Sequence, residues 1–368
     1  MREIFPETKD GVIHRVTSHI FNYNGWPTVT KDDRGVLYAA ASSYRLQHVC
    51  PAGKNCMYLS FDEGETWTCP IVVNDSYLDD RDAGIVYMGD GKLLMSWFSS
   101  KDEEQFARFK NYEWLQEPQK VAILGMGQVP LYLDENDTKP GCFVKVSEDY
   151  GVTWSENIRV PLNSPHGPNV MNDGSLIYFG KIWGGECGEH ENKIAAFHSD
   201  DDGRTWQLRG LVPLAEELEL WMMHEAHVVQ LPNGRLLGAM RVHGRPIEPS
   251  FTVYTSYSDD GGFTWSTPVC IGVDGSPPHL LVHSSGAVIC SYSRRGDDNN
   301  KHERACVSYD GGETWTEDYL INDKAMYDHG YPSTVELSDG SLLTVYYQPY
   351  PGDGPCSFLY TKWKLEEK

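Results

Sequence analysis

Short apolar runs recur along the chain in pairs, and a tight polar turn with glycine joins the two members of each pair. The six turns are Asp33-Arg-Gly35, Asp90-Gly91, Asp173-Gly174, Asn233-Gly234, Ser285-Gly286 and Asp339-Gly340. Asp-Gly or Asn-Gly between short apolar runs is a strong local signal for a β-hairpin. The strands after these turns span residues 36–41, 92–98, 175–181, 235–241, 287–294 and 341–347. The pattern predicts an all-β protein built from six similar modules.

A second repeat lies out of phase with the first. The phrase Ser-x-Asp-x-Gly-x-Thr-Trp occurs five times, at residues 60–67, 147–154, 199–206, 258–265 and 308–315. Asp and Gly suit a tight turn, because Asp bonds nearby backbone N–H groups and Gly accepts a positive φ. The tryptophan that follows can pack between neighbouring sheets. Repeats of this length indicate stacked or radial modules, so we expect a six-bladed β-propeller of four strands per blade.

The two repeats assign every segment of residues 1–368 to one propeller domain. Five blades carry the turn phrase. The sixth lacks it, and we expect residues 11–20 to supply its last strand and residues 356–364 its third. Successive turn glycines are 52–60 residues apart, except that 83 residues separate Gly91 from Gly174. The long interval indicates an insertion over about 101–142, in which residues 102–116 suit a short surface helix.

Strand direction predicts where a site would form. In each blade the residues before the inner strand and those after the second strand face one mouth of the ring, where ligands bind in such folds. Arg, His, Tyr and carboxylates recur at these positions, whereas an ordinary surface favours Lys and Glu. Before the inner strands stand Asp80, Arg81, Asp82, His166, Glu225, His227, His279, His329 and Tyr331. After the second strands stand Arg45, His48, Arg241 and Arg294.

The turn phrase resembles the Asp-box of sialidase-like β-propellers, and three segments extend the resemblance to single residues. His224-Glu225-Ala226 through Arg241 looks like the family's blade with a glutamate followed by an arginine. Residues 277–294 resemble the next blade, and Asp328-His-Gly-Tyr331-Pro-Ser resembles the blade with the tyrosine nucleophile. The resemblance implies that Arg241 and Arg294 clamp a substrate carboxylate, that Tyr331 is the nucleophile and that Glu225 is its base.

The sequence departs from the family pattern in the first blade. Gly25-Trp26-Pro27 stands where sialidases have an arginine, and no carboxylate follows Arg45 where the family's acid/base aspartate would stand. Acid/base work is therefore assigned to Asp82 or His48. The remaining mouth residues are predicted to bind substrate: Arg45, Arg81, Asp80, His166, His227, Arg241, His279, Arg294 and His329. The histidines come from separate strands without metal-ligand spacing, so we predict neither a metal nor another cofactor.

The composition of the chain narrows the range of its possible binding partners. The net charge of −22 disfavours nucleic acid and anionic membranes. There is no apolar run of eighteen residues and no apolar signal core at the start, and several of the nine cysteines, such as Cys270 and Cys290, read as buried thiols. We therefore expect a cytoplasmic protein. The aromatic residues of the insertion leave a homo-oligomer open.

Three hypotheses follow for function. The first is an exo-glycosidase acting on a glycan with an acidic or deoxy sugar, in which arginines hold the anionic group. The second is a polysaccharide lyase cleaving next to a uronate, with Tyr331 or a histidine taking the C5 proton. The third is a carbohydrate-binding propeller without turnover. We rank them in this order, because a binding site rarely needs a tyrosine beside a buried carboxylate.

Overall fold

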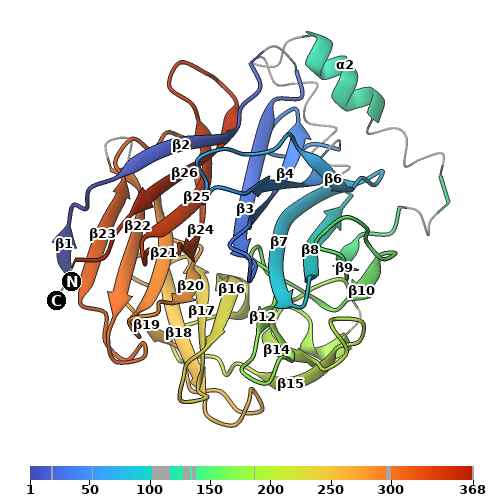
Figure 1. Ribbon diagram of the computed structural model, residues 1–368. Helices are drawn as coiled ribbons and strands as arrows, with labels where there is room; N and C mark the ends of the chain where they lie inside the picture. The colour runs from blue at the N-terminus through green and yellow to red at the C-terminus, as the bar shows by residue number, and fades with distance from the viewer. Residues whose placement is uncertain are drawn as a thin grey trace.

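Six sheets surround a central axis in the computed structural model, which describes residues 1–17, 20–51, 53–101, 117–126, 133–134, 138–185, 187–295 and 300–366 (Figure 1). The inner strands β3, β7, β12, β16, β20 and β24 pack against one another around the ring, and β24 returns to β3. The prediction of an all-β, six-bladed propeller is thus confirmed.

The first three blades run outward from the axis as follows. Blade one contains β3 (Tyr23–Lys31), β4 (Leu37–Arg45), β5 (Lys54–Ser60) and β6 (Ile71–Asn74). Blade two contains β7 (Asp79–Gly89), β8 (Lys92–Ser100), β9 (Gly141–Ser147) and β10 (Ile158–Val160). In blade three, β11 (Leu162–Asn163) and β12 (Asn169–Val170) both pair with β13 (Leu176–Ile182), followed by β14 (Ile194–Ser199) and β15 (Gln207–Leu211).

The last three blades complete the ring. Blade four contains β16 (Met223–Gln230), β17 (Leu236–His243), β18 (Phe251–Ser258) and β19 (Val269–Cys270). Blade five contains β20 (His279–Val282), β21 (Val288–Arg295), β22 (Lys301–Ser308), β23 (Glu317–Asn322) and β1 (Arg2–Ile4). Blade six contains β24 (Gly330–Glu336), β25 (Leu342–Pro349), β26 (Cys356–Trp363) and β2 (Lys9–His14).

The ring closes through the N-terminal segment. Strand β2 pairs antiparallel with β26, so the N-terminal segment supplies the outer strand of blade six, over residues 9–14 instead of the predicted 11–20. Strand β1, which the sequence pattern did not predict, pairs in parallel with β23 of blade five. Figure 1 shows both chain ends on this side of the molecule. The first strands thus join blades five and six.

The predicted insertion falls between β8 and β9. The helix expected over residues 102–116 lies outside the described residues, and the described helix α2 spans Glu117–Met126. Two single turns of 3-10 helix, Gly188–His190 and Leu220–Met222, complete the described elements. Among the described residues, no helix is both long enough and apolar enough to cross a bilayer.

The repeated phrase folds into the same turn in all five blades. In blade one, Asp62 Oδ1 accepts hydrogen bonds from Ser60 Oγ (2.8 Å) and the backbone N–H of Thr66 (2.8 Å), and Asp62 Oδ2 accepts from Thr66 Oγ1 (2.6 Å). These bonds lower the pKa of Asp62 to about 2. The same bonds from serine and threonine recur at Asp149, Asp201, Asp260 and Asp310. Each carboxylate therefore accepts hydrogen bonds from backbone N–H groups that have no backbone acceptor in the turn.

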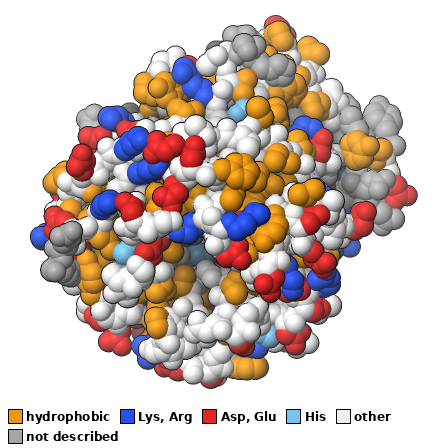
Figure 2. All heavy atoms as spheres, in the orientation of Figure 1, with side chains coloured by type: hydrophobic (Ala, Val, Ile, Leu, Met, Phe, Trp, Pro, Cys, Tyr) orange, Lys and Arg blue, Asp and Glu red, His pale blue; other side chains and the backbone are white. Residues whose placement is uncertain are grey.

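The apolar core is divided into layers between neighbouring blades. The largest layer joins blades three and four and contains Phe179, Met240 and Trp265, and the rings of Phe179 and Trp265 are 4.5 Å apart between centroids. Trp67 of blade one likewise lies 6.3 Å from Tyr360 of blade six. The expectation that these tryptophans pack between sheets is confirmed for both. On the outside, acidic, basic and apolar side chains are interspersed over the face shown in Figure 2.

Candidate functional site

Irregularities at the start of four inner strands shape the mouth of the ring. The pairing register of β3, β7, β16 and β24 shifts there, as in a β-bulge. The residues inside the shifts are Trp26, Asp82, Glu225 and Tyr331. Three of them have a positive φ: 52° for Trp26, 58° for Asp82 and 57° for Tyr331. Bulges redirect side chains, and backbone strain of this kind clusters at functional sites.

Tyr331, Glu225 and Arg241 form a chain of charge-assisted contacts. The hydroxyl of Tyr331 donates to Glu225 Oε1 at 2.5 Å, and Arg241 Nη1 donates to Glu225 Oε2 at 2.6 Å. Burial raises the pKa of Glu225, but Arg241 and the hydrogen bond from Tyr331 outweigh it and hold the pKa below its ordinary value. Burial and the charge of Glu225 raise the pKa of Tyr331 well above its ordinary value. The pair therefore rests as a phenol beside a carboxylate.

A cavity of about 350 Å³ opens beside this pair, within the size range of small-ligand sites. Its lining comprises Arg81, Asp82, Phe98, Ser100, Asn163, Lys181, Trp183, His224, Glu225 and Tyr331. Burial raises the pKa of Asp82 to about 7, with Arg81 opposing the rise and Glu225 adding to it. The cavity thus holds one carboxylate that is ionised at neutral pH and another that titrates there.

The structure places Arg295, the neighbour of the predicted clamp residue Arg294, beside Tyr331. Arg294 pairs with Asp274, with Nη2 at 3.2 Å from Oδ2. Its neighbour Arg295 instead faces the mouth, where its Cζ lies 5.3 Å from the centroid of the Tyr331 ring. Successive residues of a strand point to opposite faces, so a shift of one position decides which arginine enters the site. Arg295 Nε and Nη2 are buried without a hydrogen-bond partner, which suits them to an anion.

Trp26 occupies the place of the missing first-blade arginine. It packs with Tyr23, Tyr331 and Tyr347 in a buried aromatic cluster. Arg45 Cζ and Arg81 Cζ each lie 4.6 Å from a centroid of its ring. Trp26 carries no charge itself, but its ring binds the guanidinium groups of Arg45 and Arg81 through cation–π contacts.

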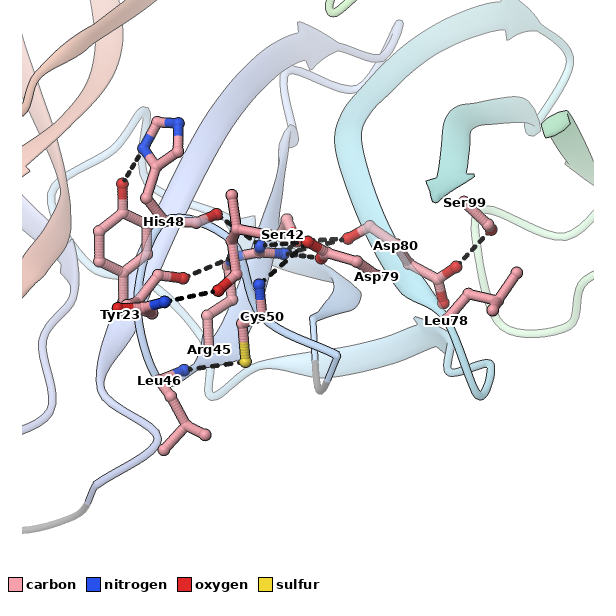
Figure 3. A network of polar contacts seen from close by, with 12 residues as sticks. Tyr23, Ser42, Arg45, Leu46, His48, Cys50, Leu78, Asp79, Asp80 and Ser99 are labelled. Carbon is pink, nitrogen blue, oxygen red and sulfur yellow. Dashed lines mark hydrogen bonds and ion pairs between the residues drawn. The ribbon is translucent and has the colours of Figure 1, made fainter. Parts of the chain in front are cut away.

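Arg45 and Asp80 are tied into the scaffold, as Figure 3 shows. Arg45 is fully buried and pairs with Asp79 through both ends of its guanidinium, at 2.6 and 3.0 Å. Asp80 accepts hydrogen bonds from Asn74, Ser76 and Ser99. The predicted contact of Arg45 and Asp80 with substrate has no geometric support, because buried partners occupy both side chains.

His48 lies outside the cavity, in the network of Figure 3 that also includes Arg45, whose Nη2 donates to the backbone carbonyl oxygen of His48 at 2.7 Å. Tyr23 Oη is 2.9 Å from His48 Nδ1 (Figure 3). The same hydroxyl donates to Asp328 Oδ2 at 2.7 Å. The His48 ring stands edge-on to Trp26, 4.9 Å away between centroids. The cavity lining described above includes Asp82 and does not include His48. Of the two acids that the sequence left open, Asp82 is the one beside Tyr331.

Three further predicted residues meet in the channel below the mouth. We call His166, His227 and His279 the channel histidines; their ring centroids lie 4.5–5.8 Å apart. Burial lowers the pKa of all three, that of His227 to about 3. Nδ1 of His227 and Nδ1 of His279 each accept a backbone N–H, which puts the proton of each neutral ring on Nε2. A ring in that state offers no lone pair to a metal ion, and among the described residues no group of metal-binding side chains is found.

The remaining predicted histidine, His329, joins blades five and six. Its Nε2 lies 3.1 Å from the carbonyl oxygen of Arg294, and its Nδ1 lies 3.2 Å from that of Met326. The ring is buried and absent from the lining of the cavity. Its contacts hold the approach to Tyr331 in place.

Comparison with known proteins identifies the family. A model of the BNR repeat-like domain matches residues 160–351, more than half of the chain. The chain belongs to this family. Sialidases of Clostridium perfringens and Paraclostridium sordellii are each 23% identical to it, over 261 and 221 residues that cover 62% and 52% of this chain. The matches span 66% and 52% of the lengths of these curated relatives.

Solved structures share the fold of this BNR-repeat protein. A protein of unknown function from Dyadobacter fermentans superposes with a TM-score of 0.73 at 20% identity, covering 98% of this chain and 99% of that one. The intramolecular trans-sialidase of Ruminococcus gnavus gives 0.63 at 15% identity, covering 94% and 95%. Trypanosoma rangeli sialidase gives 0.59 at 16%, covering 92% and 55%. At these identities the likeness supports the propeller architecture alone.

Two residues that sequence reasoning did not select, Lys181 and Phe98, also line the cavity of this BNR-repeat propeller. Lys181 lies one residue before the end of β13 and Trp183 directly after it, at the position predicted to face the mouth, and Phe98 lies two residues before the end of β8 in blade two. Trp183 stands edge-on to Phe98, 5.5 Å away between centroids. His224 stacks on His243 at 4.5 Å, beside Glu225. The strand predicted over residues 175–181 ends at Lys181, so topology alone places this side chain next to the mouth.

Proposed function

We propose that this protein is a glycoside hydrolase that acts on acidic glycans, with Tyr331 as nucleophile. The supporting observation is the 2.5 Å contact between Tyr331 Oη and Glu225 Oε1 on the wall of a cavity that also contains Asp82. A phenol needs a base to attack, and Glu225 is in place to take its proton. A leaving group needs an acid, and Asp82, with a pKa of about 7, supplies one at neutral pH.

The first step joins the sugar to the enzyme. Tyr331 Oη bonds to the anomeric carbon and passes its proton to Glu225, while the glycosidic C–O bond breaks and the leaving oxygen takes the proton of Asp82. Acid catalysis of this kind contributes on the order of 10²–10⁴-fold. Two carboxyl groups with separated pKa values thus share the work.

The second step releases the sugar. Water attacks the anomeric carbon and gives a proton to the ionised Asp82, the bond from carbon to Tyr331 Oη breaks, and the phenolate recovers its proton from Glu225. Arg241 keeps Glu225 oriented at 2.6 Å throughout. Two displacements at one carbon retain the anomeric configuration.

An acidic substrate is supported by a local cluster of positively charged side chains in a chain whose net charge is negative. The chain carries a net charge of −22, yet Arg81, Lys181, Arg241 and Arg295 gather around the Tyr331–Glu225 pair. Guanidinium groups bind carboxylates through two parallel hydrogen bonds, and Arg295 has two buried nitrogens without a partner. The names of the two curated relatives, both sialidases, agree with an acidic sugar.

A panel of acidic oligosaccharides, scored by mass spectrometry and ultraviolet absorbance, tests the proposal. We expect release of a saturated sugar with addition of water. A product that absorbs in the ultraviolet would indicate the lyase reaction instead, and binding without product would indicate a non-catalytic propeller.

The matched variants are Tyr331→Phe and Tyr347→Phe. Both tyrosines lie in the same aromatic cluster, but the hydroxyl of Tyr347 is buried without a hydrogen-bond partner in the described structure. We expect Tyr331→Phe to abolish turnover and Tyr347→Phe to keep it. Equal activity of the two variants would reject Tyr331 as nucleophile.

A further inference from the structure

The hydrogen bond between Tyr331 and Glu225 divides the mouth of the ring into two sides. Tyr331 belongs to blade six and Glu225 to blade four, so their contact crosses the mouth as a chord. Arg295 of blade five lies on one side of it. Arg81 of blade two and Lys181 of blade three line the cavity on the other side. Positive charge therefore flanks the reacting pair on both sides.

The two cations on the cavity side form no salt bridge with a carboxylate among the described residues. Arg81 makes no salt bridge with any described residue, and its Nε is buried without a hydrogen-bond partner. Its guanidinium lies over two aromatic rings, with Cζ at 4.6 Å from the ring centroid of Trp26 and 5.3 Å from that of Phe98. Lys181 donates one N–H to the carbonyl oxygen of Met223 at 2.9 Å, which leaves two N–H groups of the ammonium for other partners.

The anionic groups near this cavity do not balance these cations. Glu225 is already bonded to Arg241 and Tyr331. Asp82 titrates with a pKa of about 7 and is largely protonated at slightly acidic pH. Two partly buried cations beside one engaged carboxylate leave a site with net positive charge, and a bound anion would neutralise it.

The opposite side has its own pair of cations. Arg241 and Arg295 both face the ring of Phe251, at 4.9 and 6.0 Å from its centroid. Neither belongs to the described lining of the cavity. One carboxylate bound there is separated from Arg81 and Lys181 by the Tyr331–Glu225 pair itself.

We infer that the substrate carries an acidic group on each side of the bond that is cleaved, one held by Arg241 and Arg295 and the other by Arg81 and Lys181. This inference rests on the proposed hydrolase reaction for its scissile bond, but the two anion sites exist independently of turnover. The substrate class is an acidic glycan with charged groups on neighbouring units, such as consecutive uronates or a uronate beside a sulfated sugar. The rings of Phe98 and Trp183 supply apolar surface for the sugar on the cavity side.

Inorganic phosphate tests the two anion sites without any reaction. We expect calorimetric titration of the full chain at pH 6.5 to show two sites. Lys181→Met should weaken one of them about tenfold, because a charge-assisted hydrogen bond is lost, and Arg295→Met should weaken only the other.

Lys145→Met is the matched control. Lys145 is also partly buried and donates Nζ to a backbone carbonyl, that of Val73 at 3.1 Å, but it lies outside the cavity. The Lys145→Met variant should bind phosphate at both sites as tightly as the unmodified chain does. A single site, or a Lys181→Met variant with unchanged titration, would overturn the inference.

Disaccharides separate this inference from the proposed reaction. A uronate–uronate disaccharide is compared with the two forms in which one carboxylate or the other is reduced to an alcohol. The diacid should bind about tenfold more tightly than either monoacid, and Lys181→Met should abolish its advantage over one of them. Equal affinities overturn the inference even if hydrolysis occurs. A preference for the diacid without hydrolysis upholds the inference and refutes the proposed function.

Discussion

Replacing Asp82 by Asn should stabilise the protein at alkaline pH while it removes the proposed catalytic acid. Asp82 is buried, with 4% of its surface exposed, and its pKa is raised from 3.8 to about 7. The folded chain therefore binds this proton more tightly than the unfolded chain, so stability falls as pH rises from about 4 to about 7. A shift of this size amounts to about 4 kcal/mol, of which about 3 kcal/mol develops between pH 5 and pH 8.

The side chain of Asn cannot ionise, so the variant escapes this loss. Asn is also among the residues that best tolerate the positive φ of 58° at this position. The assay is urea unfolding of both proteins at pH 5 and pH 8. We expect the variant to gain about 3 kcal/mol relative to the parent between the two pH values. Comparing differences removes the effects of every other titrating group.

Asp260→Asn serves as the control because its pKa shift has the opposite sign. The turn hydrogen bonds lower the pKa of Asp260 to about 2, so its contribution is present above pH 4 and is lost only as pH falls toward 2. The control should lose the same stability at pH 5 and pH 8. If Asp82→Asn behaves in the same way, Asp82 is ionised in the folded protein near neutral pH and is not the acid.

Three further outcomes follow from the same structure. The rate of hydrolysis, as kcat/KM, should fall as pH rises through about 7, because Asp82 must hold a proton; a flat profile to pH 9 would contradict this. Arg295→Met should weaken binding of the acidic sugar about tenfold, and Arg294→Met should change it little, as measured by calorimetry. Stability should decline from pH 6.5 toward pH 5 by up to about 1.4 kcal/mol per pH unit for each channel histidine, since all three stay neutral in the folded chain and charge when it unfolds. Thermal unfolding between pH 7 and pH 5 checks this, and His279→Gln should make the decline shallower.

The fold was predictable because its signals are local and repeated. Each Asp-Gly turn and each copy of the serine–aspartate phrase satisfies its own backbone within a few residues, as Asp62 does. Strand β1 had no such signal, since three residues that pair with the edge of a complete blade need no pattern of their own.

The sequence predicted which side chains gather at the mouth, but not the orientation of each one. Alternation along a strand places neighbours on opposite faces, so an error of one position exchanged Arg295 for Arg294. The bulge in β7 separates Asp82, on the cavity wall, from Asp80, which buried donors hold. A bulge shows only in the pairing of two strands, so the sequence alone could not show that buried donors hold Asp80, which we predicted to bind substrate.

The mass of the enzyme during turnover tests most directly whether Tyr331 is the nucleophile. The full chain is mixed with an acidic oligosaccharide that the panel identifies as substrate, quenched in acid within milliseconds and digested. We expect the peptide that contains Tyr331 to gain the mass of one sugar residue. The corresponding peptide of the Tyr331→Phe variant should gain none. Turnover at an undiminished rate with no adduct on the peptide that contains Tyr331, or an adduct on another residue, would contradict this role of Tyr331.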